Sequence, residues 1–391
     1  MFQKIIEDLD FAIQWLPEAG SEEANRLNKD IARHVKARFC LNEGTHYKYH
    51  DELEYASEAE KWLQMAATES DKLITSGRYE IYNTGHPQED YFNMYRIDDK
   101  SDLKEAVLYV DYKTNIREHN MAAAGREAGC GFSKSFVESF LCSDGLPISL
   151  SNKYLGDETM RKETANRDPR LKQLILTNDF PTNVTDDLKD STFVVNEDEF
   201  ITQHCFTGYR PIKGFNPIYS QALYMKSSFD GIAYRYAETL LINAEAKAEL
   251  NTITNADLDR TVNQLRDRVG MPHLTVNVGF TDPKWPDWGY SLSPVLQEIR
   301  RERCIELAGE GFRFNDLKRW KAGKVLNNVL TYVGKRKPDG NLAIVYPNYT
   351  NPDLSYQAGK SRTWEDKMYL YPIPTGELQR NPQLLPQNPG W

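Results

Sequence analysis

The sequence predicts a mainly α-helical protein, in which helical hairpins support a long, irregular, loop-rich region with few short strands. Three observations predict this fold class. Apolar side chains recur at three- and four-residue spacing in the first 80 residues and again from residue 234 to 308, which is the repeat of an amphipathic helix. This periodicity is lost between about residues 79 and 224. The last 23 residues hold five prolines and are therefore expected to be non-helical.

Three helices are predicted in the first 80 residues. Apolar stripes cover residues 5–16, 27–39 and 59–73, and the second and third helices are expected to end near Gly44 and before Gly77. Short helices joined by short turns are the unit of tetratricopeptide-like hairpin arrays. The strict 34-residue consensus of such repeats is absent. The prediction of a tetratricopeptide-like scaffold therefore depends on helix pairing alone.

The region after these helices is predicted to be irregular. A short strand is indicated at residues 105–112, and a brief helix at 136–141 precedes a turn at 143–147. Long irregular connections in a compact protein are usually either functional or disordered. The many aromatic residues here argue against disorder, so we interpret residues 81–225 as a ligand-binding region.

Helical order returns near the end of this region. Helices are predicted over residues 234–248, 258–269 and 293–308, and the proline-rich tail from residue 369 should lie extended over their surface. Four segments of one compact unit are therefore expected: tetratricopeptide-like helices at 1–80, the irregular region at 81–225, a second helical scaffold at 226–334 and an extended tail at 335–391.

The composition excludes several classes of protein. The net charge is −9, which disfavours a nucleic-acid partner because phosphate binding needs a basic surface. No stretch approaches the roughly 20 consecutive apolar residues that a membrane-spanning helix needs. The five cysteines are scattered and form no CxxC pair, so they are expected to be free and mostly buried rather than disulfide-bonded or zinc-bound.

The helix predicted after residue 293 carries charges on its apolar face. At 100° per residue, Arg303 and Glu306 fall on the same side as the apolar stripe, and we expect them to pair with each other because a buried unpaired ion is costly. Glu310, Arg313 and Asp316 extend the pattern. An acid pair of an active site is one reading. A structural ion network is the preferred one, because every acid here has an arginine within three or four residues.

Other catalytic and metal-binding patterns are weak. The sequence contains no nucleophile elbow and no phosphate-binding loop. His46 and His50 have helical i, i+4 spacing, but the glutamate of a zinc-protease motif is missing, so exposed histidines are expected. Asp282 and Asp287 lie in a Trp/Pro loop that we interpret as rigid and packed, with a cation site as the alternative. We predict no catalytic residue, no structural metal and no cofactor.

Aromatic residues outside the periodic helices are better candidates for ligand contact. A sugar ring has an apolar face and a polar rim, so a flat aromatic ring beside arginine, asparagine or histidine would complement it. For each aromatic residue taken singly, packing in a small core is the better explanation. The predicted carbohydrate-binding residues are Tyr112, Arg117, His119, Asn120, Arg126, Tyr209 and Tyr219.

Six sequence segments, in the order of the chain, resemble the SusD/RagB family of outer-membrane nutrient-binding lipoproteins of Gram-negative bacteria. They are SDGLPI at 143–148, NRDPRL at 166–171, RYAETLL at 235–241 followed by NAEA at 243–246, LRDRVGMP at 265–272, the charged run at 298–320, and YPIP at 371–374 with QNPGW at 387–391. They extend from about residue 140 to the last residue, and the first 80 residues fit the earlier helices of the family.

The resemblance implies a function as well as a fold. Members of the family capture oligosaccharides, or in some cases peptides, at the cell surface and act as the lid of a SusC-type TonB-dependent transporter. They are lipid-anchored on the extracellular face of the outer membrane. The signal peptide and acylated cysteine of the family are not seen here, and Cys40 falls within a predicted helix, so we expect the chain to be truncated. The motifs mark the scaffold and do not identify ligand contacts.

A non-enzymatic glycan-binding capture protein is therefore the leading hypothesis. A peptide-binding RagB-like protein is its alternative within the family. From other classes, a glycoside hydrolase and a cytoplasmic helical-repeat adaptor remain open, because the charged C-terminal run includes several acids and no signal peptide is seen.

Overall fold

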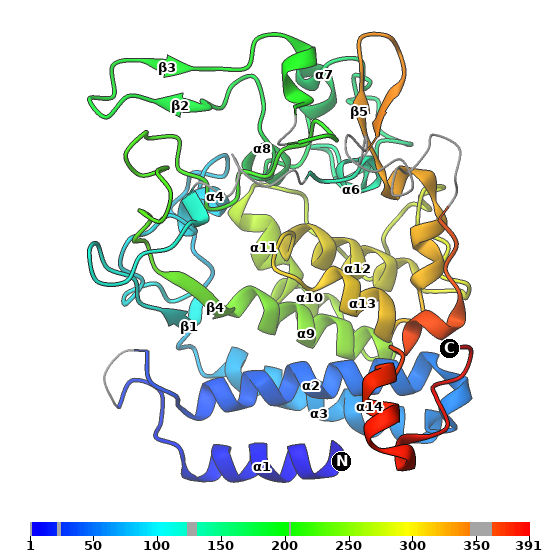
Figure 1. Cartoon of the computed structure of the whole chain (residues 1–391). Coiled ribbons are helices and arrows are strands. Elements are labelled where there is room, and N and C mark those ends of the chain that lie inside the picture. Colours follow the sequence, from blue (N-terminus) through cyan, green and yellow to red (C-terminus); the bar gives the residue numbers. More distant parts are fainter. Residues whose placement is uncertain (1, 22–24, 123–130, 203–204, 345–361) are drawn as a thin grey trace.

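The computed structural model describes residues 2–21, 25–122, 131–202, 205–344 and 362–391. Its N-terminal part is a layer of long helices, α1 (Phe2–Trp15), α2 (Lys29–Tyr49) and α3 (Ala59–Thr75). Figure 1 shows α1 and α2 running side by side at one end of the molecule, with α9 (Tyr236–Glu249) above them. The three predicted N-terminal helices are confirmed, and so is the mainly α-helical fold class.

Helix α2 is stabilised by a local cap at its start and by close packing against α3. The side chain of Asn28 accepts hydrogen bonds from the backbone N–H groups of Asp30 and Ile31 and so caps the first turn. The helix does not end near Gly44, as the sequence suggested, but continues to Tyr49. Gly44 serves packing instead, because a Cβ there would lie 2.8 Å from Cγ of Leu63 on α3. The missing side chain lets α2 and α3 approach closely.

The second helical scaffold packs on this layer. It consists of α9, α10 (Asn255–Asp259), α11 (Val262–Arg268), α12 (Pro294–Glu306) and α13 (Arg313–Arg319). The helix predicted over 258–269 is therefore two short helices. Small and apolar residues of α9 are fully buried and lie in two core clusters, one shared with α11 and α12 and the other with α2 and α3. Helix α9 thus joins the two halves of the scaffold.

A two-stranded antiparallel ladder forms the start of the irregular region. Strand β1 (Ala106–Val110) is confirmed where the sequence predicted it, and it pairs with β4 (Gly231–Arg235), which leads directly into α9. The sequence alone does not predict β4. Its partner lies over 120 residues earlier in the chain, so no local pattern signals the pairing.

The rest of the irregular region is built from short elements around a core of its own. They are α4 (Asp90–Met94), α6 (Lys134–Ser139), α7 (Met160–Thr164), α8 (Arg170–Leu174), β2 (Asn183–Val184) and β3 (Ser191–Thr192). The core is rich in aromatic residues, with Tyr91, Phe140, Phe200 and Tyr209 almost completely buried. Figure 1 places β2, β3 and α7 at the end of the molecule opposite α1.

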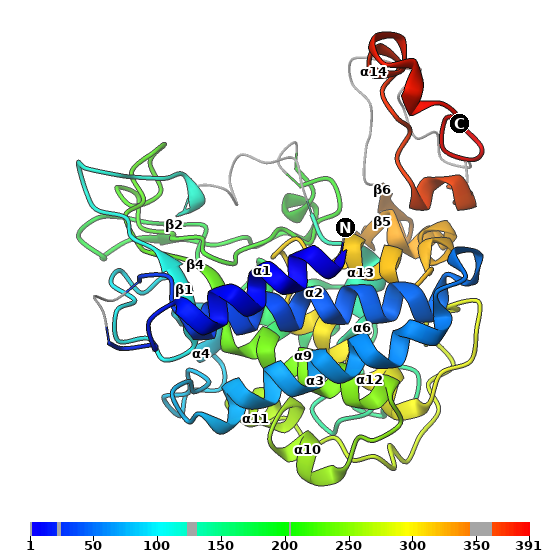
Figure 2. The same ribbon diagram turned by 90° about the horizontal axis from the view of Figure 1, so that it is seen from below.

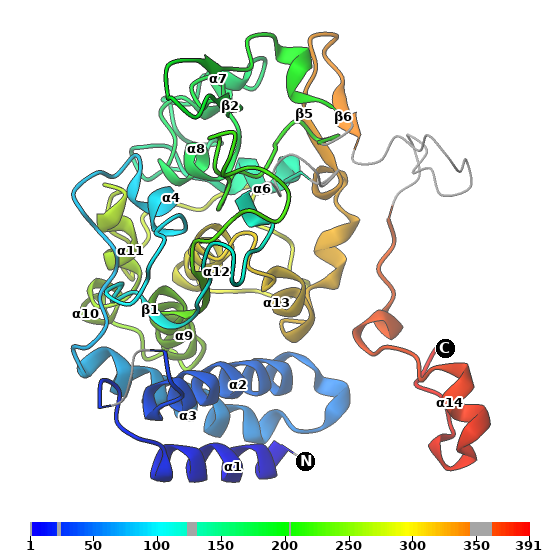
Figure 3. The same cartoon turned by 60° about the vertical axis from the view of Figure 1, so that its left-hand side comes forward.

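The tail departs from the sequence expectation. After the hairpin of β5 (Val333–Arg336) and β6 (Leu342–Ile344), it contains the helix α14 (Thr375–Arg380), so the prediction of a wholly non-helical tail is wrong. Prolines are tolerated before a helix and after it, and Pro374 and Pro382 flank α14 without interrupting it. Figures 2 and 3 show α14 standing away from the helical scaffold rather than lying over it.

Short 3-10 helices complete the described chain. They are η1 (Asp51–Leu53), η2 (Ala56–Glu58), η3 (Glu197–Phe200), η4 (Gly323–Asn327), η5 (Val329–Thr331), η6 (Asp366–Tyr369) and η7 (Pro382–Leu384). No helix in the described ranges is long and apolar enough to cross a membrane. The cysteines in those ranges are free, and Cys40, Cys142 and Cys205 are buried, as predicted, whereas Cys130 falls outside them.

Candidate functional site: a paired-loop surface supported by a buried ion network

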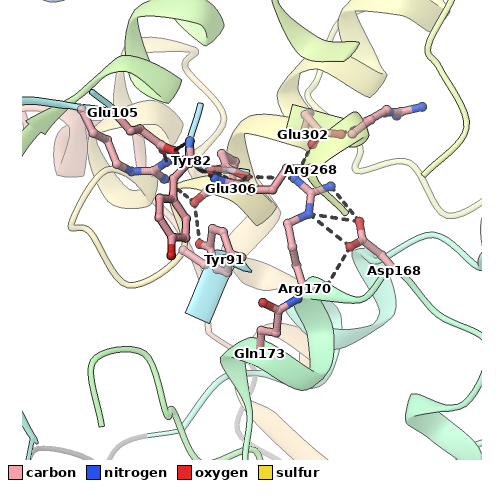
Figure 4. Close-up of polar contacts among 12 residues, drawn as sticks. Tyr82, Tyr91, Glu105, Asp168, Arg170, Gln173, Arg268, Glu302 and Glu306 are labelled. Carbon is pink, nitrogen blue, oxygen red and sulfur yellow. Dashed lines mark hydrogen bonds and ion pairs between the residues drawn. The ribbon is translucent and has the colours of Figure 1, made fainter. Parts of the chain in front are cut away.

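Glu306, near the end of α12, is the centre of a buried ion network (Figure 4). Its carboxylate is fully buried and accepts hydrogen bonds from three guanidinium groups. Arg268 of α11 donates to both oxygens at 2.7 and 2.6 Å. Arg235, the last residue of β4, donates at 2.7 Å, and Arg170 of α8 donates at 3.0 Å. Three distant parts of the chain therefore meet at one carboxylate.

Further acids extend the network around these arginines. Arg170 also binds Asp168, with 2.7 Å between Nη2 and Oδ2, and it contacts Glu302. Arg235 reaches Glu105 at 3.1 Å, next to β1, and its Nη2 lies 2.7 Å from Glu310. These residues come from α8, β4, α12 and the segments beside them. The network therefore fastens the irregular region to the helical scaffold.

The electrostatics of Glu306 suit a structural ion rather than a proton donor. Burial alone would raise the pKa of its carboxyl, but the positive charges of Arg268, Arg235 and Arg170 outweigh burial and lower that pKa well below its usual value. A general acid needs the opposite shift. Glu306 is thus held ionised, and its interactions fix the helices in place.

The pairing predicted between Arg303 and Glu306 is wrong. Nε of Arg303 lies 3.0 Å from Oδ2 of Asp316 on α13, and Arg319 donates to the same carboxylate at 3.0 Å. Residues three apart share a helix face, but Glu306 accepts its hydrogen bonds from Arg170, Arg235 and Arg268. Arg313 lies near the rings of two tryptophans. The charged run forms buried ion pairs, but with partners different from those predicted.

The motifs that carried the family resemblance supply most of this network. Asp168 and Arg170 belong to the segment NRDPRL, Arg235 begins RYAETLL, and Arg268 belongs to LRDRVGMP. Each was expected to belong to the scaffold, but the convergence of their charges was not predicted. Each of these segments contains both arginine and an acid, and such residues are tolerated in a core only when they are paired.

Three of the predicted ligand residues lie together beside the β1–β4 ladder. The guanidinium of Arg117 lies 5.0 Å from the centroid of the Tyr112 ring. The ring of His119 meets that of Tyr112 edge-on at 4.4 Å. Nε2 of His119 lies 2.8 Å from the carbonyl oxygen of Phe229 and donates to it. Burial lowers the pKa of His119 more than this hydrogen bond raises it, so the imidazole is neutral at pH 7.

Two chain segments meet at this place and form what we call the paired-loop surface, residues 112–122 and 216–229. The backbones of His119 and Ser227 exchange hydrogen bonds of 2.9 and 3.1 Å. The side chain of Asn120 accepts a hydrogen bond from the backbone N–H of Met225. Tyr219, also a predicted residue, lies on the second segment and is 52% exposed. Four of the seven predicted residues, Tyr112, Arg117, His119 and Asn120, thus lie together, while Tyr219 lies on the second segment where its backbone N–H donates to the carbonyl of Val184.

The paired-loop surface also exposes apolar side chains that the sequence analysis missed. They are Ile116, Met121, Leu223, Tyr224 and Met225. Soluble proteins rarely expose several large apolar side chains in one place without a use for them. Leu223, Tyr224 and Met225 are adjacent in the sequence, and such an apolar run is ordinarily read as a buried strand, so the sequence gives no signal that they face solvent.

The remaining predicted ligand residues are placed differently. Tyr209 is fully buried, and its hydroxyl lies 2.8 and 2.9 Å from the carboxylate oxygens of Glu163. Its ring belongs to the aromatic core of the irregular region, so it supplies no surface for a ligand. Arg126 lies outside the described residues.

The histidine and aspartate positions considered for metals are engaged in other contacts. His46 and His50 are stacked, with ring centroids 4.1 Å apart, and His50 is buried and bonded to Glu52 and to a backbone carbonyl. The expectation of exposed histidines is therefore wrong. Asp282 is paired with Arg301 at 2.6 Å. In the part of the chain that the structure describes, no group of three or more potential ligands could hold a metal ion.

Comparison with known proteins shows where this architecture recurs. The family model described as the SusD family matches residues 66–391. A relative named SusD-like protein P2, from Formosa agariphila, is 24% identical over 404 residues, an alignment that spans the whole of this chain but only 65% of the relative. This chain is therefore shorter than the relative that it matches.

Solved structures give the same result for the fold. A SusD-like protein from Bacteroides fragilis is 25% identical with a TM-score of 0.69, and the alignment covers 100% of this chain and 71% of the other. A second structure from the same organism, named as a SusD-like carbohydrate binding protein, is 21% identical with a TM-score of 0.66, covering 98% of this chain and 70% of the other. The described part of this chain therefore has the fold of these two proteins.

Proposed function

The chain belongs to the SusD family, and on this premise we propose that it binds oligosaccharides at the cell surface and delivers them to a SusC-type TonB-dependent outer-membrane transporter. Family membership supports the ligand class, as does the carbohydrate binding in the name of one structural neighbour. The family also supports a location on the extracellular face of the outer membrane, held by a lipid anchor. Capture occurs without cleavage of the ligand.

The observation that carries this proposal is the paired-loop surface. Tyr219 offers an exposed ring on one segment, and Arg117 and Asn120 lie on the other. A flat aromatic ring complements the apolar face of a sugar, while guanidinium and amide groups bind its hydroxyls. The buried ion network holds the scaffold beneath these loops, so the ligand meets a surface that is already formed.

Binding without chemistry agrees with the titration behaviour of this surface. Glu118, an acid on the first segment, has its pKa lowered, chiefly by a backbone hydrogen bond from Asn115. A glycosidase needs one carboxyl with a raised pKa to protonate the leaving oxygen. Capture needs only complementarity to the ground state of the ligand, which neutral His119 and ionised Glu118 do not oppose.

The direct test is isothermal titration calorimetry of the purified chain against a panel of plant, host and microbial oligosaccharides and a set of peptides. Transfer to a transporter favours modest affinity, and a Kd between about 1 mM and 1 μM corresponds to roughly −4 to −8 kcal/mol. Binding of an oligosaccharide, with no product in a parallel time course, supports the proposal. Binding of peptides alone would favour the RagB-like alternative, and release of shorter sugars would favour a glycoside hydrolase.

A pair of matched variants tests the position of the site. Tyr219→Ala removes an exposed ring from the paired-loop surface, whereas Tyr55→Ala removes a ring of similar exposure, 55% against 52%, from the segment before α3. One stacked aromatic ring contributes about 1 kcal/mol, so Tyr219→Ala should weaken the Kd roughly fivefold. Equal affinities in both variants would place the ligand elsewhere. Co-purification with a β-barrel receptor tests the transporter partner.

A further inference from the structure

A cavity of about 600 Å³ lies apart from the paired-loop surface, among α6, α12, α13, the loop before α12 and the 3-10 helices η4 and η5. Its volume falls within the range of about 300–1,000 Å³ that small-molecule sites occupy. Lys284, Asp287 and Lys324 line it and are exposed, so it is open to solvent. Nothing in the proposed function uses this cavity.

Two tryptophans form a fixed apolar wall of the cavity. The indole N–H of Trp285 donates to Glu298 at 2.7 Å, and that of Trp288 donates to Gln297 at 2.6 Å. Trp288 also meets Trp320 edge-on, with 5.5 Å between ring centroids. Because these hydrogen bonds fix the two rings, they are already in place for a flat ligand and lose little entropy on binding.

Two of the basic side chains around the cavity form no ion pair with a described acid, although one of them, Arg313, interacts electrostatically with buried Asp316. Five basic and three acidic side chains line it. Lys284 is paired with Glu138 at 3.0 Å, and Arg301 with Asp282 at 2.6 Å. A third base, Arg300, is paired with Glu249 of α9, outside the cavity. Two basic side chains and one exposed acidic side chain of the lining therefore remain without an ion pair to a described residue.

Those two bases are Arg313 and Lys324. Nη1 of Arg313 is buried, yet it has no hydrogen-bond partner among the described residues, and its guanidinium lies 5.9 Å from the ring centroids of both Trp288 and Trp320. Lys324 forms no ion pair with a described acid. The remaining acid, Asp287, is exposed and accepts a hydrogen bond from the backbone of Gly289. A buried donor without a partner is costly, and a bound anion would satisfy it.

We propose that this cavity is a second ligand site that takes an anionic sugar unit, a pyranose ring bearing a carboxylate or a sulfate. The anionic group is bound by Arg313 and Lys324, and the apolar face of the sugar ring lies against the tryptophan wall. This inference rests on the proposed function, because it assigns an acidic class of glycan to a protein that captures glycans. It adds a specificity that the paired-loop surface does not supply.

The test compares glucuronate, glucose 6-sulfate and glucose by calorimetry and by tryptophan fluorescence, since two indoles line the cavity. One or both anions should bind more tightly than glucose, and their affinity should fall as salt is added. Tighter binding of glucuronate would identify a carboxylate site, and tighter binding of glucose 6-sulfate a sulfate site. Equal binding of glucose, or no binding of either anion, would overturn the proposal.

Variants tie this preference to the cavity. Lys324→Gln removes an exposed, unpaired charge, and Lys61→Gln makes the same substitution on α3, where the lysine is 60% exposed and lies 3.9 Å from Glu58. Loss of one charge-assisted hydrogen bond should weaken anion binding roughly tenfold in Lys324→Gln and leave it unchanged in Lys61→Gln. Arg313→Gln should also weaken anion binding. Wild-type anion affinity in Lys324→Gln would refute the assignment.

The two sites can fail independently. Tyr219→Ala should leave glucuronate binding unchanged, and Lys324→Gln should leave neutral oligosaccharide binding unchanged. If Tyr219→Ala abolishes glucuronate binding, the cavity is refuted while the paired-loop proposal stands. If anions bind at the cavity but no oligosaccharide binds the loops, the paired-loop proposal fails while the cavity stands.

Discussion

Replacing Glu306 by glutamine removes one negative charge from among three arginines while keeping the shape of the side chain. Removing one partner of a buried ion pair costs about 3–5 kcal/mol. The structure argues for the lower end, because Arg170 keeps Asp168 and Arg235 keeps Glu105 and Glu310. Only Arg268 is left with weak contacts, 3.4 and 3.5 Å from Glu105. We expect a loss of about 3 kcal/mol, or about 6 °C in Tm at roughly 2 °C per kcal/mol.

Thermal and urea unfolding followed by circular dichroism measure this effect. Glu80→Gln is the matched control, because Glu80 is 69% exposed and pairs with Lys104 at 3.1 Å, so its loss should change stability by less than about 1 kcal/mol. Equal melting curves for Glu306→Gln and Glu80→Gln would refute a structural role for the network.

The pH dependence of the same variant gives an independent check. The folded-state pKa of Glu306 is depressed, so its contribution to stability is fully present above the unfolded pKa of about 4.3 and is lost as the pH falls toward the folded value. Below pH 4.3 the contribution of Glu306 to the free energy of unfolding of the wild type should fall by about 1.4 kcal/mol per pH unit. The difference in the free energy of unfolding between the wild type and Glu306→Gln should therefore shrink as the pH falls from 5 to 3.

Three other positions give predictions of their own. Gly44→Ala should destabilise the protein by about 1–3 kcal/mol in urea unfolding, because its Cβ would press on Leu63, whereas Gly376→Ala, with nothing within 4 Å, should be neutral or slightly stabilising. Burial raises the pKa of Glu43 to about 7, which lowers stability as the pH rises from about 4.5 to 7; Glu43→Gln should therefore raise Tm at pH 8 more than at pH 5. Burial, and to a lesser degree His50, lowers the pKa of His46 to about 4, so an NMR titration should show no protonation of His46 near pH 6.5.

The fold could be predicted from the sequence where local signals agree with packing. The stripe of α3 and the cap of α2 at Asn28 are local, and the predicted helices are found there. The position of β4 depends on β1, far away in the chain, so it was missed. The density of prolines in the tail argues against a helix, but Pro374 and Pro382 lie at the flanks of α14 and leave its interior free of proline.

The candidate site was only partly predictable, because some of its contacts join residues that are far apart in the sequence. Tyr112, His119 and Tyr219 share an irregular, aromatic-rich context, which the sequence displays. Tyr209 has that context too, but its hydroxyl is bonded to Glu163, 46 residues away, and no spacing rule reveals such a contact. The true partners of Glu306 were hidden likewise, since charge pairing in a core is decided by tertiary contacts.

Hydrogen exchange with and without a bound neutral oligosaccharide tests the central claim most directly, namely that ligand is held by loops and that the buried ion network only supports them. We predict slower exchange in peptides covering residues 112–122 and 216–229, with no change in α11 and α12. Protection confined to α11 and α12, where Arg268 and Glu306 lie, would contradict the account.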